Sequence, residues 1–63
     1  MHHAPEEFMQ QARESFNAGK YKETLVLLSK AEGQLHKLKG DARRDLAYDI
    51  WDLKTSVRLT TLA

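Results

Sequence analysis

The chain has 63 residues, with 10 Lys plus Arg, 9 Asp plus Glu, a net charge of +1 and no Cys. This composition excludes a disulfide framework, a thiolate metal site and a strongly basic nucleic-acid footprint, and no run of 18 apolar residues is present that would span a membrane. A domain of this size buries only about 60% of the surface that its unfolded chain exposes, so it needs either very good helix packing or a partner chain.

The first helix is predicted over residues 5–18. Pro5 suits a first helical turn because its missing N–H has no partner there, and the two glutamates that follow it favour the positive end of the helix dipole. Gly19 is expected to end this helix in the left-handed conformation. Apolar side chains recur every four residues and form one stripe, at Phe8, Ala12 and Phe16.

The second helix is predicted over residues 20–39, ended by Gly40. Leu27 is expected at the edge of its apolar face, and Val26 is expected to be exposed. Gly33 is predicted to be an interior residue, at a cost of about 1 kcal/mol relative to Ala. The apolar face itself is formed by Tyr21, Leu25, Leu28, Leu35 and Leu38, and Thr24 and Ala31 are predicted to fill the same face.

The third helix is predicted over residues 42–61, with Asp41 as its N-cap. Its inward-facing seam alternates spacings of four and three, at Leu46, Ile50, Leu53 and Val57. The connections are very short, so neighbouring helices are expected to run antiparallel. The predicted fold class is an all-α antiparallel three-helix bundle, with residues 1–63 forming a single domain.

The first two predicted helices resemble a tetratricopeptide repeat (TPR). The aromatic, small and turn positions of that repeat are matched by Phe8, Ala12, Phe16, Gly19 and Tyr21. Leu28 takes the later large apolar position and Ala31 the small position of the second helix. Two residues depart from the pattern, because Thr24 replaces the family's most characteristic alanine and His36 replaces its closing proline. The resemblance covers about half of the chain, and it implies a helical hairpin that binds other proteins.

Repeat hairpins of this kind normally stack in threes or more, because one hairpin cannot bury its own apolar faces. The third helix or another copy of the chain is therefore expected to cover the hairpin. A second resemblance is to MIT domains, which are TPR-like hairpins with one added helix. That resemblance implies recognition of short helical peptides in a groove.

The third predicted helix has a second apolar stripe on the side opposite its inward seam. It is formed by Tyr48, Trp51, Thr55, Leu59 and Leu62. These residues are predicted to contact a partner, most simply a second copy across a two-fold axis, because Trp and Tyr are enriched at binding hot spots. The alternative is that Tyr48 and Trp51 reach sideways to wrap around a small core.

Positive charge gathers before and at the start of the third helix, at Lys37, Lys39, Arg43 and Arg44. Such a run could contact phosphates or an acidic partner. No aromatic residue lies within it to stack on a base, and runs like this are more often solvated loops.

The sequence offers little for catalysis, cofactors or metals. No glycine-rich elbow accompanies a serine, and no phosphate-binding loop is present. The row of Asp45, Asp49 and Asp52 could bind a cation or do acid–base work, but such rows more often pair with basic residues. His2, His3 and His36 have no metal-ligand spacing, so no metal or cofactor is predicted.

The sequence therefore predicts a cytoplasmic, non-enzymatic protein-interaction module that self-associates through its third helix. One alternative is a small regulator that binds and blocks a single target protein. The other is a nucleic-acid accessory protein that uses the basic residues between positions 37 and 44.

Overall fold

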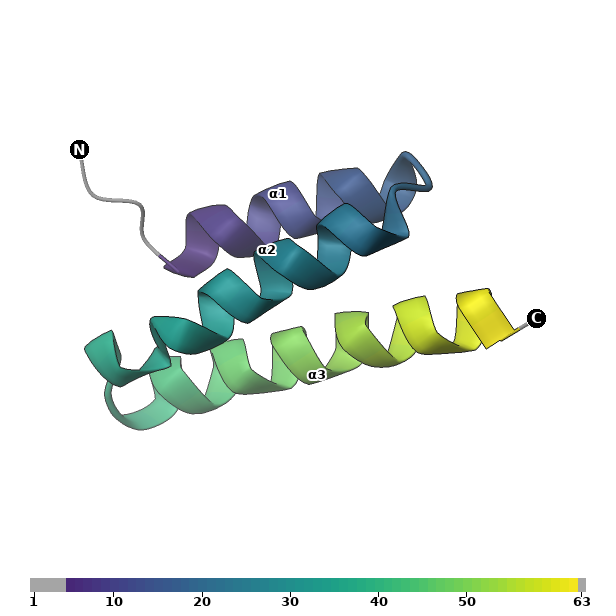
Figure 1. Cartoon of the computed structure of the whole chain (residues 1–63). Coiled ribbons are helices and arrows are strands. Elements are labelled where there is room, and N and C mark those ends of the chain that lie inside the picture. The colour runs from purple at the N-terminus through teal and green to yellow at the C-terminus, as the bar shows by residue number, and fades with distance from the viewer. Residues whose placement is uncertain (1–4, 63) are drawn as a thin grey trace.

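The computed structural model describes residues 5–62, and this part of the chain is all-α with three α-helices, as predicted. Helix α1 spans Pro5–Asn17, α2 spans Tyr21–Gly33 and α3 spans Gly40–Leu62, and a 3₁₀ turn, η1, lies at Leu35–Lys37. Successive helices run in opposite directions, so α1 and α3 point the same way (Figure 1). All three α-helices contact one another.

Helix α1 begins at Pro5, as predicted, and ends one residue earlier than predicted. Its end is a Schellman motif centred on Gly19, which has the expected positive φ of 79°. The Gly19 N–H donates to the Phe16 carbonyl at 3.0 Å. The Lys20 N–H donates to the Ser15 carbonyl at 2.8 Å. These two bonds satisfy carbonyls that the end of a helix would otherwise leave unpaired.

Helix α2 ends at Gly33, and the prediction that it continues to residue 39 is wrong. A glycine inside a helix is costly, and here the chain uses Gly33 as the last helical residue instead. The backbone then tightens, with the Gln34 N–H donating to the Ala31 carbonyl at 3.0 Å before η1 begins. Gly40 therefore does not end α2. With φ of 64° it turns the chain into α3.

Helix α3 begins two residues earlier than predicted, at Gly40, and ends one residue later, at Leu62. Asp41 therefore lies in the first turn of α3 and is not the N-cap that the sequence predicted. Its carboxylate still faces the positive end of the helix dipole. It also accepts a hydrogen bond from Arg44 Nη2 at 3.1 Å.

The core lies between the three helices, and half of the ten side chains predicted to form it are confirmed as buried. Ala12, Leu28, Leu46, Ile50 and Val57 are buried. The predicted core residues Phe8, Leu35 and Leu53 are only partly buried and pack against the core. Phe16 and Tyr21 are also half-buried, and their rings pack against each other beside the α1–α2 turn, with centroids 5.5 Å apart. The main cluster of buried side chains consists of Met9, Ala12, Leu27, Leu28, Ala31, Leu46 and Ile50.

The buried face of α2 is rotated from the predicted one. Leu25 was expected inside but is 39% exposed, whereas Leu27, expected at the edge, is buried. Thr24 and Ala31 lie at the centre of the buried arc and are both 0% exposed. The rotation follows from the position of α2, which contacts α1 on one side and α3 on the other. Val26 is exposed, as predicted.

Candidate functional site

The residues predicted to contact a partner form a line along the outer side of α3. We call this line the α3 strip, which consists of Tyr48, Trp51, Thr55, Leu59 and Leu62. Trp51 is 62% exposed, Leu59 is 66% exposed and Leu62 is 77% exposed. Tyr48 is exposed as well, and Thr55 is half-buried. Tyr48 and Trp51 therefore do not wrap around the core, as the alternative interpretation of these residues required.

The opposite side of α3 fixes the direction in which the strip points. Leu46, Ile50 and Val57 are buried against the other helices. At about 100° per residue, they point roughly away from the midline of the α3 strip. Since both stripes belong to one helix, burial of the inner stripe necessarily presents the α3 strip to solvent.

Two ion pairs tie α3 to the hairpin. Arg13 of α1 lies 3.4 Å from Asp49, measured between Nη2 and Oδ2. On the α2 side, Lys54 Nζ donates to Glu32 Oε1 at 2.6 Å. Both pairs are partly exposed and contribute little stability, about 1 kcal/mol or less each. Each pair connects one flank of α3 to the hairpin, Asp49 to α1 and Lys54 to α2.

Trp51 is flanked by two hollows in the surface. The first lies on α3 itself, and its lining includes Tyr48 and Ala47. The second lies between α3 and the end of α2, where Leu35 and Ile50 form its apolar part beside the Lys54–Glu32 ion pair. Ala47 borders both hollows because its methyl group is too short to cover the indole ring. Sequence reasoning missed Ala47, although an alanine one turn before Trp51 is a visible signal.

The predicted basic residues surround the turn between α2 and α3. Lys37, Lys39, Arg43 and Arg44 are all exposed. Arg44 is engaged by Asp41, as described above. The segment is thus a solvent-facing turn at the end of the molecule where α3 begins (Figure 1).

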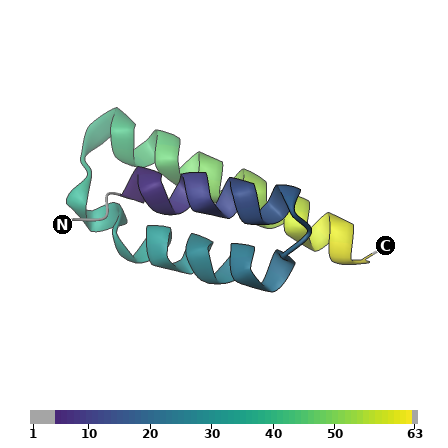
Figure 2. The same cartoon turned by 90° about the horizontal axis from the view of Figure 1, so that it is seen from above.

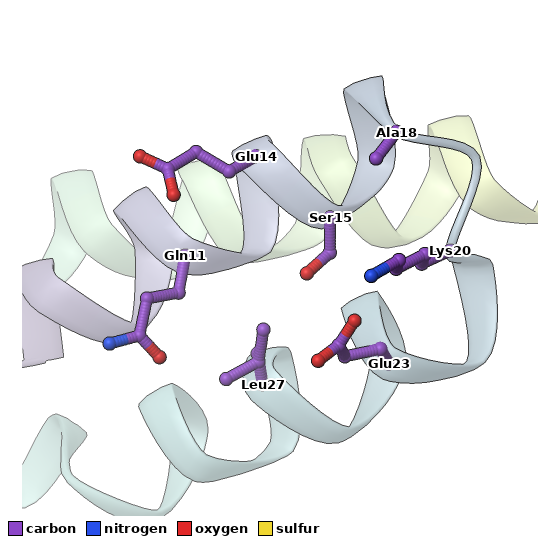
Figure 3. A pocket seen from close by; sticks show the side chains of 7 residues that line it. All are labelled: Gln11, Glu14, Ser15, Ala18, Lys20, Glu23 and Leu27. Carbon is purple, nitrogen blue, oxygen red and sulfur yellow. The ribbon is translucent and has the colours of Figure 1, made fainter.

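A groove that sequence reasoning did not predict lies between α1 and α2. Ser15, Lys20 and Glu23 extend into it close to the turn, and Leu27 contributes an apolar side chain (Figure 3). Figure 2 shows that α3 does not lie on this open side of the hairpin. The groove mixes both charges with apolar atoms and is shallow, which favours weak polar contacts over enclosure of a ligand.

The other predicted sites are exposed. Asp45, Asp49 and Asp52 all face solvent, and Asp49 is the residue that pairs with Arg13. Within residues 5–62, no group of three or more His, Cys, Asp or Glu side chains is arranged to hold a metal ion. His2 and His3 lie outside the described residues. In the same range, no helix combines the length and apolar character that crossing a membrane requires.

Comparisons with protein-family models, with curated proteins and with solved structures find no match to this chain. The resemblances to TPR repeats and to MIT domains therefore stay predictions.

Proposed function

We propose that this chain is a non-enzymatic helical protein-interaction module that self-associates through the α3 strip. The observation that supports the proposal is the exposure of large apolar side chains in one line on α3, opposite the side that packs on α1 and α2. Single exposed apolar residues are ordinary on protein surfaces, but a continuous line that includes Trp and Tyr is typical of an interface.

The energetic reason is the small size of the domain. Its buried cluster is formed by only a few side chains, and a core of that size rarely supplies more than about 5 kcal/mol of stability. Apolar surface removed from water stabilises a protein by about 25 cal/mol per Å². Covering the α3 strip with another chain would therefore add substantially to a small total.

The resemblance to TPR hairpins belongs to the same proposal. A hairpin of that type is stabilised by stacking on neighbouring helices, and here α3 covers one side of it while exposing a further apolar line. The absence of cysteine suits work in the reducing cytoplasm, which we propose as its location.

Light scattering on the purified chain tests the proposal. We expect a mass of at least a dimer for the parent and the mass of a folded monomer for the Trp51→Ala, Leu59→Ala double variant. Truncation of hot-spot side chains costs about 2 kcal/mol or more each, so association should weaken by more than a hundredfold. Circular dichroism checks that the variant remains helical.

The matched control is Val26→Ala. Val26 is 55% exposed on α2 and does not belong to the α3 strip, so its truncation should leave the mass of the parent unchanged. A parent that is already a folded monomer at high concentration contradicts self-association. The α3 strip would then serve a different protein, as the regulator hypothesis requires.

A further inference from the structure

The two edges of the α3 strip carry charges of opposite sign. At about 100° per residue, Asp52 lies roughly 60° to one side of the midline of the strip, and Arg58 lies roughly 60° to the other. We call the first side the acidic edge and the second the basic edge. The acidic edge contains Asp41, Asp45 and Asp52. The basic edge is Arg58, with Lys54 and Arg43 further round the same side of the helix, roughly 100° and 120° from the midline.

Most of these edge charges are available for contacts with another chain. Asp45, Asp52, Arg43 and Arg58 are exposed. Lys54 is half-buried and already engaged by Glu32. Arg44 is the one charged residue on the line of the α3 strip, and it lies at the N-terminal end of the strip. Because Arg44 is paired with Asp41, repulsion between the two copies of Arg44 in a dimer is reduced.

The edges determine which two-fold arrangement of identical helices is electrostatically favourable. In a two-fold dimer both copies use the same surface. If the axis runs along the helices, the copies are parallel, and the acidic edge of each lies beside the basic edge of the other. If the axis is perpendicular to the helices, the copies are antiparallel, and each edge lies beside its own like-charged counterpart. The same rule makes flanking charges select orientation in coiled coils.

Building on the self-association proposed above, we infer that two copies of this chain pack their α3 strips together with the α3 helices parallel. Each residue of the strip then lies beside its own copy along the whole length of the interface. Trp51 meets Trp51, and Thr55 meets Thr55. The acidic and basic edges close the interface on both sides with opposite charges, which both stabilises the parallel arrangement and disfavours the antiparallel one.

Disulfide trapping distinguishes the two arrangements, and the chain contains no native cysteine to interfere. Two single variants of the full chain, Thr55→Cys and Leu62→Cys, are oxidised separately. Positions 55 and 62 lie about 10 Å apart along α3 at 1.5 Å per residue. A disulfide requires Cα atoms within about 7 Å of each other, so an antiparallel pair can bring at most one of these positions beside its own copy.

We expect both variants to form covalent dimers rapidly and at dilute concentration. The Glu23→Cys variant, altered on the exposed surface of α2, serves as the control for random collisions and should be trapped slowly. If light scattering shows a dimer but only one or neither α3 variant is trapped, the parallel arrangement is wrong while self-association stands. A parent that remains monomeric overturns both.

Reversal of one edge charge gives an independent readout. In the parallel arrangement, Asp52→Lys places like charges together and should weaken association several-fold, with the difference shrinking at high salt. Glu23→Lys changes the net charge equally but away from the strip, and it should have no such effect. Unchanged or stronger association of the Asp52→Lys variant would show that the acidic edge does not face a basic one.

Discussion

At the level of single residues, Thr24 shows how the core tolerates a polar group. Its side chain is 0% exposed, and its Oγ1 donates to the Lys20 carbonyl at 2.9 Å. The same carbonyl accepts the Thr24 N–H at 3.0 Å. A threonine inside a helix commonly satisfies its hydroxyl in this way, one turn back along its own helix. The buried arc of α2 therefore includes a hydroxyl without leaving it unpaired.

We expect Thr24→Ala to destabilise the fold by about 1.5 kcal/mol. The loss of a buried methyl group and of one hydrogen bond, each worth about 1 kcal/mol, outweighs the gain in helix propensity of roughly 0.5 kcal/mol. Urea unfolding followed by circular dichroism measures the change. Thr60→Ala, on the exposed end of α3, is the control and should be neutral or slightly stabilising. A Thr24→Ala protein as stable as the parent would mean that the hydroxyl and methyl together contribute no more than the helix propensity that alanine gains.

At the level of helices, Gly19 and Gly33 lie at the ends of α1 and α2 in equally open surroundings but differ in backbone conformation. A Cβ atom added at Gly19 or at Gly33 would meet no heavy atom within 4 Å. Only Gly19 has a positive φ, which is strained for residues that have a Cβ atom. The difference between them is therefore one of backbone conformation and not of space.

The same substitution should consequently change stability in opposite directions at these two positions. Gly19→Ala is expected to cost about 1 kcal/mol, because alanine must adopt the left-handed conformation there. Gly33→Ala is expected to gain about 0.5 kcal/mol, because alanine restricts the unfolded chain and favours the helix. Thermal unfolding of both variants tests this, and two shifts of the same sign would refute the assigned backbone roles.

Helix ends could be predicted where local sequence signals agree. The buried face of a helix could not, because packing against neighbouring helices determines it. Pro5 and Gly19 mark the bounds of α1 because each is suited to one end of a helix. Gly33 is ambiguous, since a helix can continue through it or stop at it, and the predicted helix runs six residues past the observed end of α2. Leu27 is buried in place of Leu25 because α2 packs against both α1 and α3. The apolar periodicity of one helix does not show how many neighbours that helix has.

Only the part of the candidate site that lies on a single helix could be predicted from the sequence. The α3 strip and its charged edges could be predicted, because they require only the helical repeat of α3. The hollows beside Trp51 could not, because one of them exists only where α2 ends near Leu35. The predicted orientation of helices survives the error in the length of α2, since η1 turns the chain within the same segment.

At the level of the whole molecule, stability depends on a few large side chains. Leu28 is 0% exposed and belongs to the cluster shared by all three helices. A leucine-to-alanine change at such a site costs about 2–5 kcal/mol, through lost burial and the cavity that remains. That range is comparable to the entire stability expected for a domain of this size.

We therefore expect Leu28→Ala to leave the chain largely unfolded when dilute and to recover helix as concentration rises. Association binds the folded form and so raises its population by mass action. Circular dichroism over a hundredfold range of concentration measures both effects. Val26→Ala is again the control, because that side chain is exposed. A fully helical, concentration-independent Leu28→Ala variant would show that this core site is not limiting.

The final turns of α3 extend past the α1–α2 turn (Figure 1), and residues 58–62 are all exposed. An exposed helical end is held mainly by its own backbone hydrogen bonds, and short helical segments with little packing fray in water. Leu59 and Leu62 lie in this overhang, so two of the four large apolar side chains of the α3 strip stand on the least supported part of the helix. A partner that binds this end would complete the helix as it binds, and the free energy of ordering those last residues would be subtracted from the affinity.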